Sequence, residues 1–152
     1  MALESAKLNR VILLVDDLEA AIERFSALLG VEFTVLEVPD LDARAAICDG
    51  GIELVASLRD GVLPAGARRG NGVLIGVGFR VDDIDGSKAE ATRLGLRAVP
   101  EFEIGQAGAT FRECVFEKES FGDIPIAIEQ FEGDSFVRAI LGGGDAPSGG
   151  EA

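Results

Sequence analysis

The sequence contains no histidine, tryptophan or tyrosine, and it has only two cysteines and one methionine. Without histidine, the commonest nitrogen ligand of transition metals is missing, and so is the usual general base for a serine or cysteine nucleophile. Serine–histidine and cysteine–histidine catalysis are therefore excluded. Cys48 and Cys114 do not form a Cys-x-x-Cys motif, and we expect both to be small buried side chains rather than a disulfide.

Basic residues are also scarce, since 14 Lys and Arg stand against 27 Asp and Glu and give a net charge of −13. A phosphate backbone needs a basic footprint, so nucleic acid is not an expected partner. No apolar run reaches the ~18 residues of a membrane span, and the N-terminus lacks the basic and apolar segments of a secretory signal. We expect a cytoplasmic protein with no membrane partner.

What the sequence does contain is an internal repeat. Val15-Asp16-Asp17-Leu18-Glu19 returns 66 residues later as Val81-Asp82-Asp83-Ile84-Asp85. Each motif closes an apolar strand and opens a helix, and the helices end at Gly30 and Gly95. A third echo pairs Ile52-Glu53-Leu54 with Ile128-Glu129-Gln130. This repeat predicts two copies of one supersecondary unit around a shared core, with any site built from paired positions.

Each unit has the order β-α-β-β-β by its apolar periodicity and its turn residues. The expected elements of the first unit are strands 8–15, 33–38, 43–48 and 52–58 and helix 18–29. Those of the second are strands 72–81, 98–104, 111–116 and 124–131 and a helix that ends near residue 94. The predicted boundaries are a first unit at 1–58, a linker at 59–71, a second unit at 72–132, a short helix at 133–141 and a flexible tail at 142–152, in a single compact domain.

This pattern resembles the vicinal oxygen chelate superfamily, which includes glyoxalase I, extradiol dioxygenases and bleomycin resistance proteins. The resemblance covers about residues 7 to 132 and depends on the two Val-Asp-Asp motifs and on the Ile-Glu of each last strand. It implies an α+β fold in which two tandem βαβββ units form curved mixed sheets around a cleft, with the helices outside.

For the metal-dependent members, the resemblance implies a histidine or similar ligand on the first strand of each unit and a glutamate on the last. The glutamates are present as Glu53 and Glu129, but the first-strand positions hold Arg10 and Gly76, which cannot ligate a metal. Two carboxylates alone hold Mg²⁺ only weakly, through water. We expect no functional metal and no cofactor.

Two buried carboxylates without a metal need a compensating charge. We expect Arg10 to pair with Glu53 or Glu129, and Arg112 is a candidate partner for the other. This network is either a structural replacement for the metal or a site in which Glu53 and Glu129 act as acid–base catalysts. Gly76 is expected to leave volume for a bulky ligand.

Nine phenylalanines supply all the aromatic rings, and several fall on strands that can line the cleft. Phe121 lies in a long hairpin that can act as a lid beside a cavity. The expected ligand-binding residues are Arg10, Ile12, Glu53, Gly76, Arg112, Phe116, Phe121, Glu129 and Phe131.

Three functions remain open. The first is binding of a small organic molecule in the cleft, favoured as sequestration of the kind seen in antibiotic-binding resistance proteins. The second is a lyase- or isomerase-type enzyme of natural-product metabolism that uses a cleft glutamate, and the third is a regulatory or interaction module with a vestigial cleft. We also expect a homodimer, because apolar strands such as 72–79 need their edges covered.

Overall fold

The computed structural model describes residues 6–39, 42–57, 73–106 and 108–142. The predicted linker at 59–71 and all of the predicted tail except residue 142 lie outside the described residues. The first unit contains β1 (Lys7–Leu14), α1 (Leu18–Leu29), β2 (Thr34–Val38), β3 (Ala43–Ile47) and β4 (Ile52–Ser57). The second contains β5 (Val73–Arg80), α2 (Ile84–Arg93), the 3-10 turn η3 (Pro100–Phe102), β6 (Phe111–Val115), the 3-10 turn η4 (Lys118–Phe121) and β7 (Ile126–Phe131), and α3 (Phe136–Ile140) follows it.

The two Val-Asp-Asp motifs start the two long helices. Asp17 Oδ1 accepts a hydrogen bond from Ala20 N at 2.9 Å, and Asp83 Oδ1 accepts one from Gly86 N at 3.0 Å. Each aspartate is thus the N-cap of its helix, as the repeat predicts. At the other end of α1, Gly30 adopts φ 66°, a left-handed conformation that glycine takes without steric cost.

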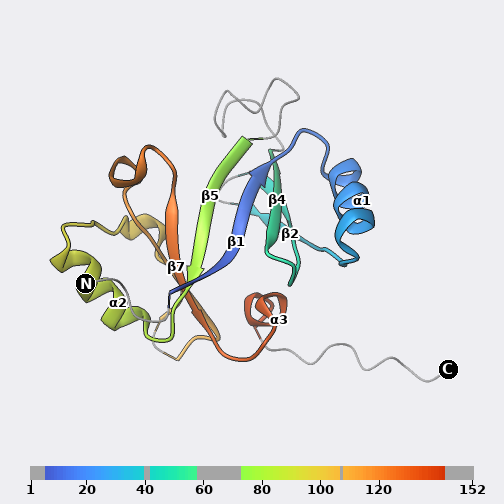
Figure 1. The fold of residues 1–152 in the computed structure, drawn as a ribbon. Helices are drawn as coiled ribbons and strands as arrows, with labels where there is room; N and C mark the ends of the chain where they lie inside the picture. The colour runs from blue at the N-terminus through green and yellow to red at the C-terminus, as the bar shows by residue number, and fades with distance from the viewer. Residues whose placement is uncertain (1–5, 40–41, 58–72, 107, 143–152) are drawn as a thin grey trace.

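All seven strands form one sheet in the order β2-β3-β4-β1-β5-β7-β6. The units meet where β1 pairs with β5 in antiparallel fashion, while β1 with β4 and β5 with β7 are parallel pairs. The sheet curls into a half-barrel, with α1 and α2 on the outer side of their own units (Figure 1). The predicted α+β fold of two curved units with helices outside is confirmed.

The outer face carries one apolar cluster under each long helix. Leu18 and Leu54 are buried in the cluster beneath α1, and Ile84 and Ile128 in the one beneath α2. Cys48 and Cys114 are buried free thiols, as predicted. No helix among the residues described is long and apolar enough to cross a membrane.

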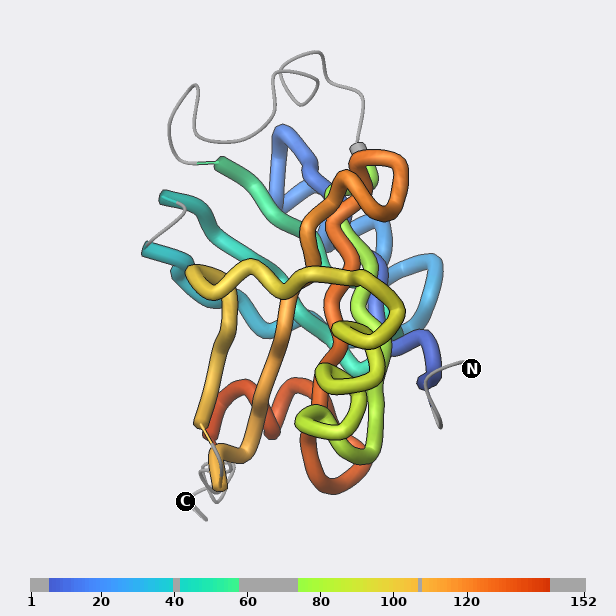
Figure 2. The backbone as a smooth tube through the Cα atoms, turned by 90° about the vertical axis from the view of Figure 1, so that its left-hand side faces the viewer, coloured from blue at the N-terminus to red at the C-terminus, as the bar shows by residue number. Residues whose placement is uncertain are grey.

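The predicted strand at 98–104 is wrong as a regular strand. Its ends form isolated bridges, Ala98 with Phe116 and Ile104 with Glu113, and η3 lies between them. Pro100 lacks an N–H group and fixes φ, so it cannot continue a ladder. The segment still runs beside β6, as the yellow and orange tubes of Figure 2 show.

The third helix differs from the other two because it packs on the inner, concave face. Phe136 and Ala139 of α3 are buried against Ile47 of the first unit and Phe131 of the second. Figure 1 shows α3 at the lower end of the half-barrel, between the two units. The predicted short helix is confirmed, with Ser135 as its N-cap, and it covers one end of the concave face.

Candidate functional site

Arg10 lies at the centre of the concave face and contacts three glutamates. Its Nε donates to Glu129 Oε1 at 2.6 Å, its Nη2 donates to Glu113 Oε2 at 2.5 Å, and its Nη1 pairs with Glu53 Oε2. The Arg10 side chain is 8% exposed. Its guanidinium carbon also stands 4.9 Å from the centre of the Phe136 ring, so α3 covers this group. We call Arg10, Glu53, Glu113 and Glu129 the Arg10 cluster.

A bulge in β1 allows two neighbouring side chains to reach one carboxylate. The register shifts between Leu8 and Arg10, which leaves Asn9 as an extra residue opposite β5. Asn9 Nδ2 donates to Glu129 Oε2 at 2.6 Å, so both carboxylate oxygens of Glu129 are hydrogen-bonded. Glu129 is fully buried, at 0% exposure.

The burial of Glu129 also depends on a glycine. Gly78 is the strand partner of Arg10, and a Cβ atom at Gly78 would overlap the Glu129 carboxylate. A side chain at this position would therefore push Glu129 away from Arg10 and Asn9.

Glu113 is the member of the cluster that sequence reasoning missed. Burial raises its pKa from the ordinary 4.5 to about 7, an effect that the nearby Arg10 opposes and the Glu129 carboxylate reinforces. A carboxyl group with this pKa exchanges a proton near neutral pH. The sequence shows Glu113 within the predicted strand 111–116, but its pairing with Glu129 of β7 is set by the register of the sheet and is seen only in the structure.

The structure brings together three of the sequence-predicted site residues, Arg10, Glu53 and Glu129. The equivalence of Glu53 and Glu129 that the repeat suggests, however, does not hold in the structure. Val15 N donates to the Val55 carbonyl, whereas the equivalent Val81 N donates to the Glu129 carbonyl. Glu129 therefore corresponds to Val55, two residues beyond the position equivalent to Glu53.

The suggested pairing of Arg112 with a cleft glutamate is wrong. Arg112 faces the outer side of the sheet and binds Asp85 of α2 through Nη1 at 3.0 Å and Nη2 at 2.9 Å. Phe116 and Phe121 lie outside the cluster too, since their rings pack 6.4 Å apart in the apolar core beneath α2.

Neighbouring atoms of Ile12 and Pro125 fill most of the volume that was expected to be free at Gly76. A Cβ atom there would meet Ile12 Cδ1 and the Pro125 carbonyl oxygen, both at 3.3 Å. Ile12 is also the strand partner of Gly76. The ring centres of Phe131 and Phe136 lie 5.9 Å apart, so Phe131 forms part of the surface on which α3 packs.

The residues of the Arg10 cluster do not fit a metal ion. Its three carboxylates converge on a guanidinium group, which is a donor and cannot ligate a cation. Over 6–39, 42–57, 73–106 and 108–142, no group of three or more His, Cys, Asp or Glu is arranged to hold a metal. The Arg10 guanidinium fills the space in which these carboxylates would have to meet a metal ion.

A family model described as the Glyoxalase/Bleomycin resistance protein/Dioxygenase superfamily matches residues 9–112. No curated protein matches the chain. Among solved structures, the chain is similar to methylmalonyl-CoA epimerase from Mycobacterium tuberculosis, with 23% identity over 83% of this chain and 88% of that one and a TM-score of 0.68. The chain is also similar to a Streptomyces coelicolor methylmalonyl-CoA epimerase in complex with 2-nitronate-propionyl-CoA, with 17% identity over 84% of this chain and 98% of that one and a TM-score of 0.66. A third similar structure is a hypothetical protein from Bacillus halodurans C-125, with 15% identity over 86% of this chain and 97% of that one and a TM-score of 0.68. Identities this low establish the fold alone.

Proposed function

Because this chain belongs to the Glyoxalase/Bleomycin resistance protein/Dioxygenase superfamily, we propose that it binds a small organic molecule on the concave face between its two units. In this proposal the molecule is held without a metal and is not chemically changed. The supporting relatives are of two kinds. The family description includes bleomycin resistance proteins, and the S. coelicolor epimerase was determined in complex with 2-nitronate-propionyl-CoA.

The observation that carries the proposal is the internal pairing of the Arg10 cluster. Every nitrogen of the Arg10 guanidinium faces a glutamate, and Glu129 is fully buried, so it cannot touch a ligand. Glu53 and Glu113 keep 12% and 10% of their side-chain surface exposed. They are the members of the cluster that a ligand can reach, and both are already engaged. This arrangement suits a polar wall for a bound molecule better than it suits a free catalytic base.

A second candidate function is supported by Glu113. A carboxyl group with a pKa of about 7 is matched to proton transfer at neutral pH, and the solved structures similar in fold include epimerases. In this alternative Glu113 transfers a proton to or from a ligand, and Arg10 stabilises the negative charge that develops on the ligand.

The third candidate, an interaction module, is supported by α3. Phe136 stands over Arg10, so part of the concave face is already covered by the chain itself. This alternative predicts that no small molecule binds on the concave face.

The test uses bleomycin and methylmalonyl-CoA as probes, each titrated calorimetrically into the protein. Ile12→Trp adds bulk beside Gly76 on the concave face, and Leu28→Trp adds the same ring on the exposed end of α1 as the matched control. We expect Ile12→Trp to abolish the binding of whichever probe binds, and Leu28→Trp to leave it intact.

Proton NMR of methylmalonyl-CoA in D₂O then separates holding from catalysis. Exchange of the hydrogen at the carbon between its two carbonyl groups would support the enzyme. Binding that survives Ile12→Trp would place the ligand elsewhere. If neither probe binds, and native mass spectrometry of the protein from its own cells finds no bound compound, the binding proposal fails in favour of the interaction module.

A further inference from the structure

The ring of Phe136 on α3 is enclosed by side chains of both units. Its centre lies 5.7 Å from that of Phe111, in an edge-on arrangement, and 5.9 Å from that of Phe131, and Ile47 packs in the same apolar cluster. The guanidinium carbon of Arg10 lies 4.9 Å from the ring centre. We call Ile47, Phe111, Phe131 and Arg10 the Phe136 pocket. The concave face thus contains a pocket for one phenyl ring, and the chain fills it with a ring of its own.

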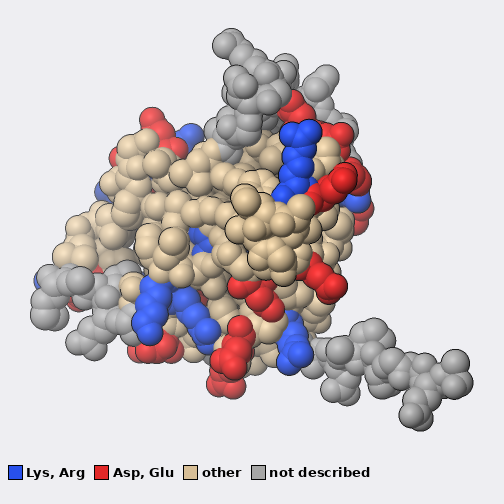
Figure 3. Space-filling model, turned by 45° about the vertical axis from the view of Figure 1, so that its right-hand side comes forward, with Lys and Arg blue, Asp and Glu red and all other residues tan. Residues whose placement is uncertain are grey.

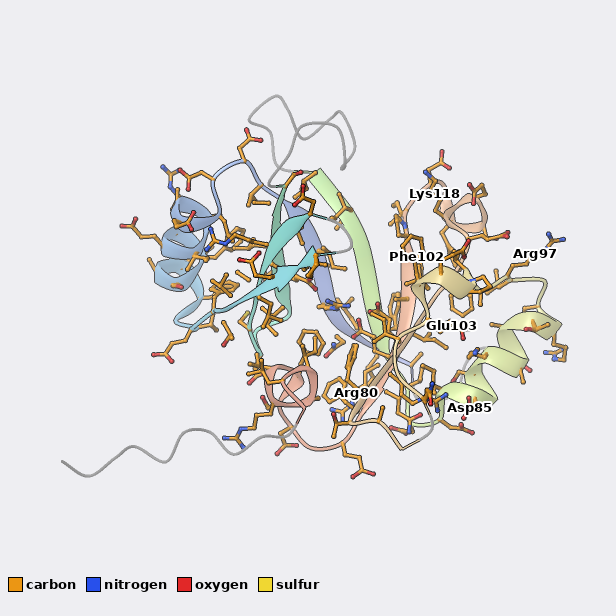
Figure 4. All side chains as sticks on the ribbon, turned by 180° about the vertical axis from the view of Figure 1, so that it is seen from behind. Arg80, Asp85, Arg97, Phe102, Glu103 and Lys118 are labelled. Carbon is orange, nitrogen blue, oxygen red and sulfur yellow. The ribbon has the colours of Figure 1, made fainter. Side chains whose placement is uncertain are left out.

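The walls of the Phe136 pocket belong to the sheet and not to α3. Phe131 is held from behind by Arg80, whose guanidinium carbon lies 3.9 Å from the ring centre. Arg80 Nη2 also donates to the Phe131 carbonyl at 2.7 Å and to the Gly133 carbonyl at 3.0 Å. Figure 4 shows Arg80 at the same end of the half-barrel as α3. The pocket therefore keeps its walls if α3 moves away.

The contacts that hold α3 itself are few. It has five residues, and Phe136 is its only large side chain that is buried. A hollow of about 380 Å³ runs along Ala139 on one flank, and one of about 480 Å³ runs along Val137 on the other. Among the described residues, Asp49 and Thr110 supply the hydrogen bonds that tie α3 to the two units. Ordering this segment costs conformational entropy at each residue, so the covered state is only weakly favoured.

The segment that joins β7 to α3 has the properties of a hinge. Glu132, Gly133 and Asp134 are all exposed, and Gly133 has φ 81°, which glycine adopts without strain. A few exposed residues at the end of an element are enough to absorb a rotation. This segment allows α3 to swing away while β7 stays in the sheet.

The Phe136 pocket favours an uncharged aromatic ring as its alternative occupant. Aromatic walls suit a ring in edge-on contact, and a guanidinium attracts the face of a ring. An anion would instead meet the three glutamates that surround Arg10. Charge does not mark a ligand site from outside, since Figure 3 shows Lys and Arg interspersed with Asp and Glu over the visible face.

We propose that α3 is an autoinhibitory element of the concave face and that Phe136 occupies the place of an aromatic ring of the ligand. When α3 swings away, a ring of the ligand enters the Phe136 pocket and contacts Arg10. This control of access rests on the proposed function, since it concerns a ligand of the same concave face.

The test uses toluene, which is the side chain of phenylalanine without its backbone, and follows the Ile47 methyl signals of the full chain by ¹³C NMR. Phe136→Ala empties the pocket, whereas Asp49→Ala keeps the ring and removes a tie of α3. The apparent affinity is the intrinsic affinity multiplied by the open fraction. We expect Phe136→Ala to bind toluene most tightly and Asp49→Ala to bind it about tenfold more tightly than the wild type, the effect of losing one capping interaction.

Two further variants control the comparison. Ser135→Ala removes the N-cap of α3 from the other side of the same contact and should act like Asp49→Ala. Asp17→Ala removes the N-cap of α1 and should bind toluene like the wild type. In Asp49→Ala, toluene should also speed hydrogen exchange of the Leu141 amide, which bonds to the Val137 carbonyl in α3.

Three results would overturn the proposal. They are a folded Phe136→Ala that does not bind toluene, equal toluene affinities for Asp49→Ala and Asp17→Ala, and toluene binding that leaves the Leu141 amide protected. The toluene series is read from Ile47 and Leu141 whether or not bleomycin or methylmalonyl-CoA binds. Binding of either probe that Ile12→Trp abolishes supports the proposed function whatever toluene does, so failure of one proposal is distinguishable from failure of the other.

Discussion

At the scale of single residues, Arg10 compensates three glutamates that otherwise repel one another. Glu113 and Glu129 are strand partners, and Glu53 approaches the guanidinium from β4. A buried charge that loses its partner destabilises a fold more strongly than the intact pair stabilises it. The cluster therefore makes the stability of this protein depend on Arg10 and on the protonation of its carboxyl groups.

Arg10→Gln should lower the free energy of unfolding by about 3–5 kcal/mol at neutral pH, because it leaves buried carboxylates without a cation. Urea unfolding measures the loss. Without Arg10, the folded protein holds protons on these carboxylates more tightly than the unfolded chain does, so the deficit should shrink as the pH falls. Arg93→Gln, at an exposed ion pair, should have little effect at any pH. A deficit that stays constant with pH would show that the cluster is not the cause.

Glu113→Gln should change how stability depends on pH. Since the folded pKa of Glu113 is about 7 and its ordinary value is 4.5, the folded state binds more protons between these values, and this group costs the wild type stability as the pH rises through that window. Relative to Glu113→Gln, the wild type should lose about 3 kcal/mol between pH 4.5 and 7 as an upper bound. Urea unfolding of both proteins across this range measures the difference. Parallel pH profiles would contradict the assignment.

Gly78→Ala should destabilise the fold by about 1–3 kcal/mol, because the added methyl group displaces the buried Glu129 carboxylate. The measurement is a double-mutant cycle by thermal or urea unfolding. In a Glu129→Ala background, the same Gly78→Ala change should cost much less, because the overlapping carboxylate is gone. Additive effects of the two substitutions would show that Gly78 and Glu129 do not interact.

At the scale of elements, α3 is tied to both units. Asp49, after β3, accepts hydrogen bonds from Ser135 Oγ at 2.9 Å and from Val137 N at 3.1 Å. On the other unit, the Thr110 hydroxyl donates to the Ala139 carbonyl at 3.2 Å. A five-residue helix is too short to be stable alone, so these contacts and the burial of Phe136 hold it over the concave face.

Asp49→Ala should therefore loosen α3 by about 1–2 kcal/mol, the range for the loss of a helix-capping interaction. Hydrogen exchange of the Ala139 and Leu141 amides, which close α3, should become faster. Asp17→Ala is the reciprocal control, because it removes the N-cap of α1 and should speed exchange there and not in α3. Unchanged exchange in α3 would mean that Asp49 does not hold the helix.

At the scale of the whole molecule, the order of strands changes the argument for a dimer. The strand at 72–79 was expected to need covering, but β5 lies in the middle of the sheet between β1 and β7. One end of the sheet is β2, where Val35 is 41% exposed. An edge strand is a template for pairing with a second copy about a two-fold axis.

We therefore expect a homodimer by light scattering at micromolar concentration. Val35→Lys places a charge in the middle of the edge strand, which is how proteins block edge pairing, so it should shift the protein toward monomers. Glu37→Lys reverses the sign of a charge that β2 already carries, so it tests whether the sign of a charge on this strand affects pairing. A wild-type protein that is monomeric at this concentration would contradict the prediction.

The sequence by itself determined the architecture of this protein. The Val-Asp-Asp motifs and their glycine stops are local signals, since a helix cap acts over three residues and an apolar stripe over a few turns. They predicted α1 and α2, while the two curved units were implied by the resemblance to the vicinal oxygen chelate superfamily. The resemblance to the vicinal oxygen chelate superfamily also implied that Arg10, Glu53 and Glu129 lie together, and the structure brings them into one cluster.

Only the tertiary structure decided how that centre is completed. Glu113 enters it from a strand 103 residues away from Arg10, and Glu129 stands two residues beyond its expected equivalent. Arg112 turns to Asp85 instead of joining it. These outcomes depend on strand register, which is set by bulges and by packing between distant segments, and one residue of register moves a side chain to the opposite face. No signal along the chain carries that information, because the partners meet only when the sheet has formed.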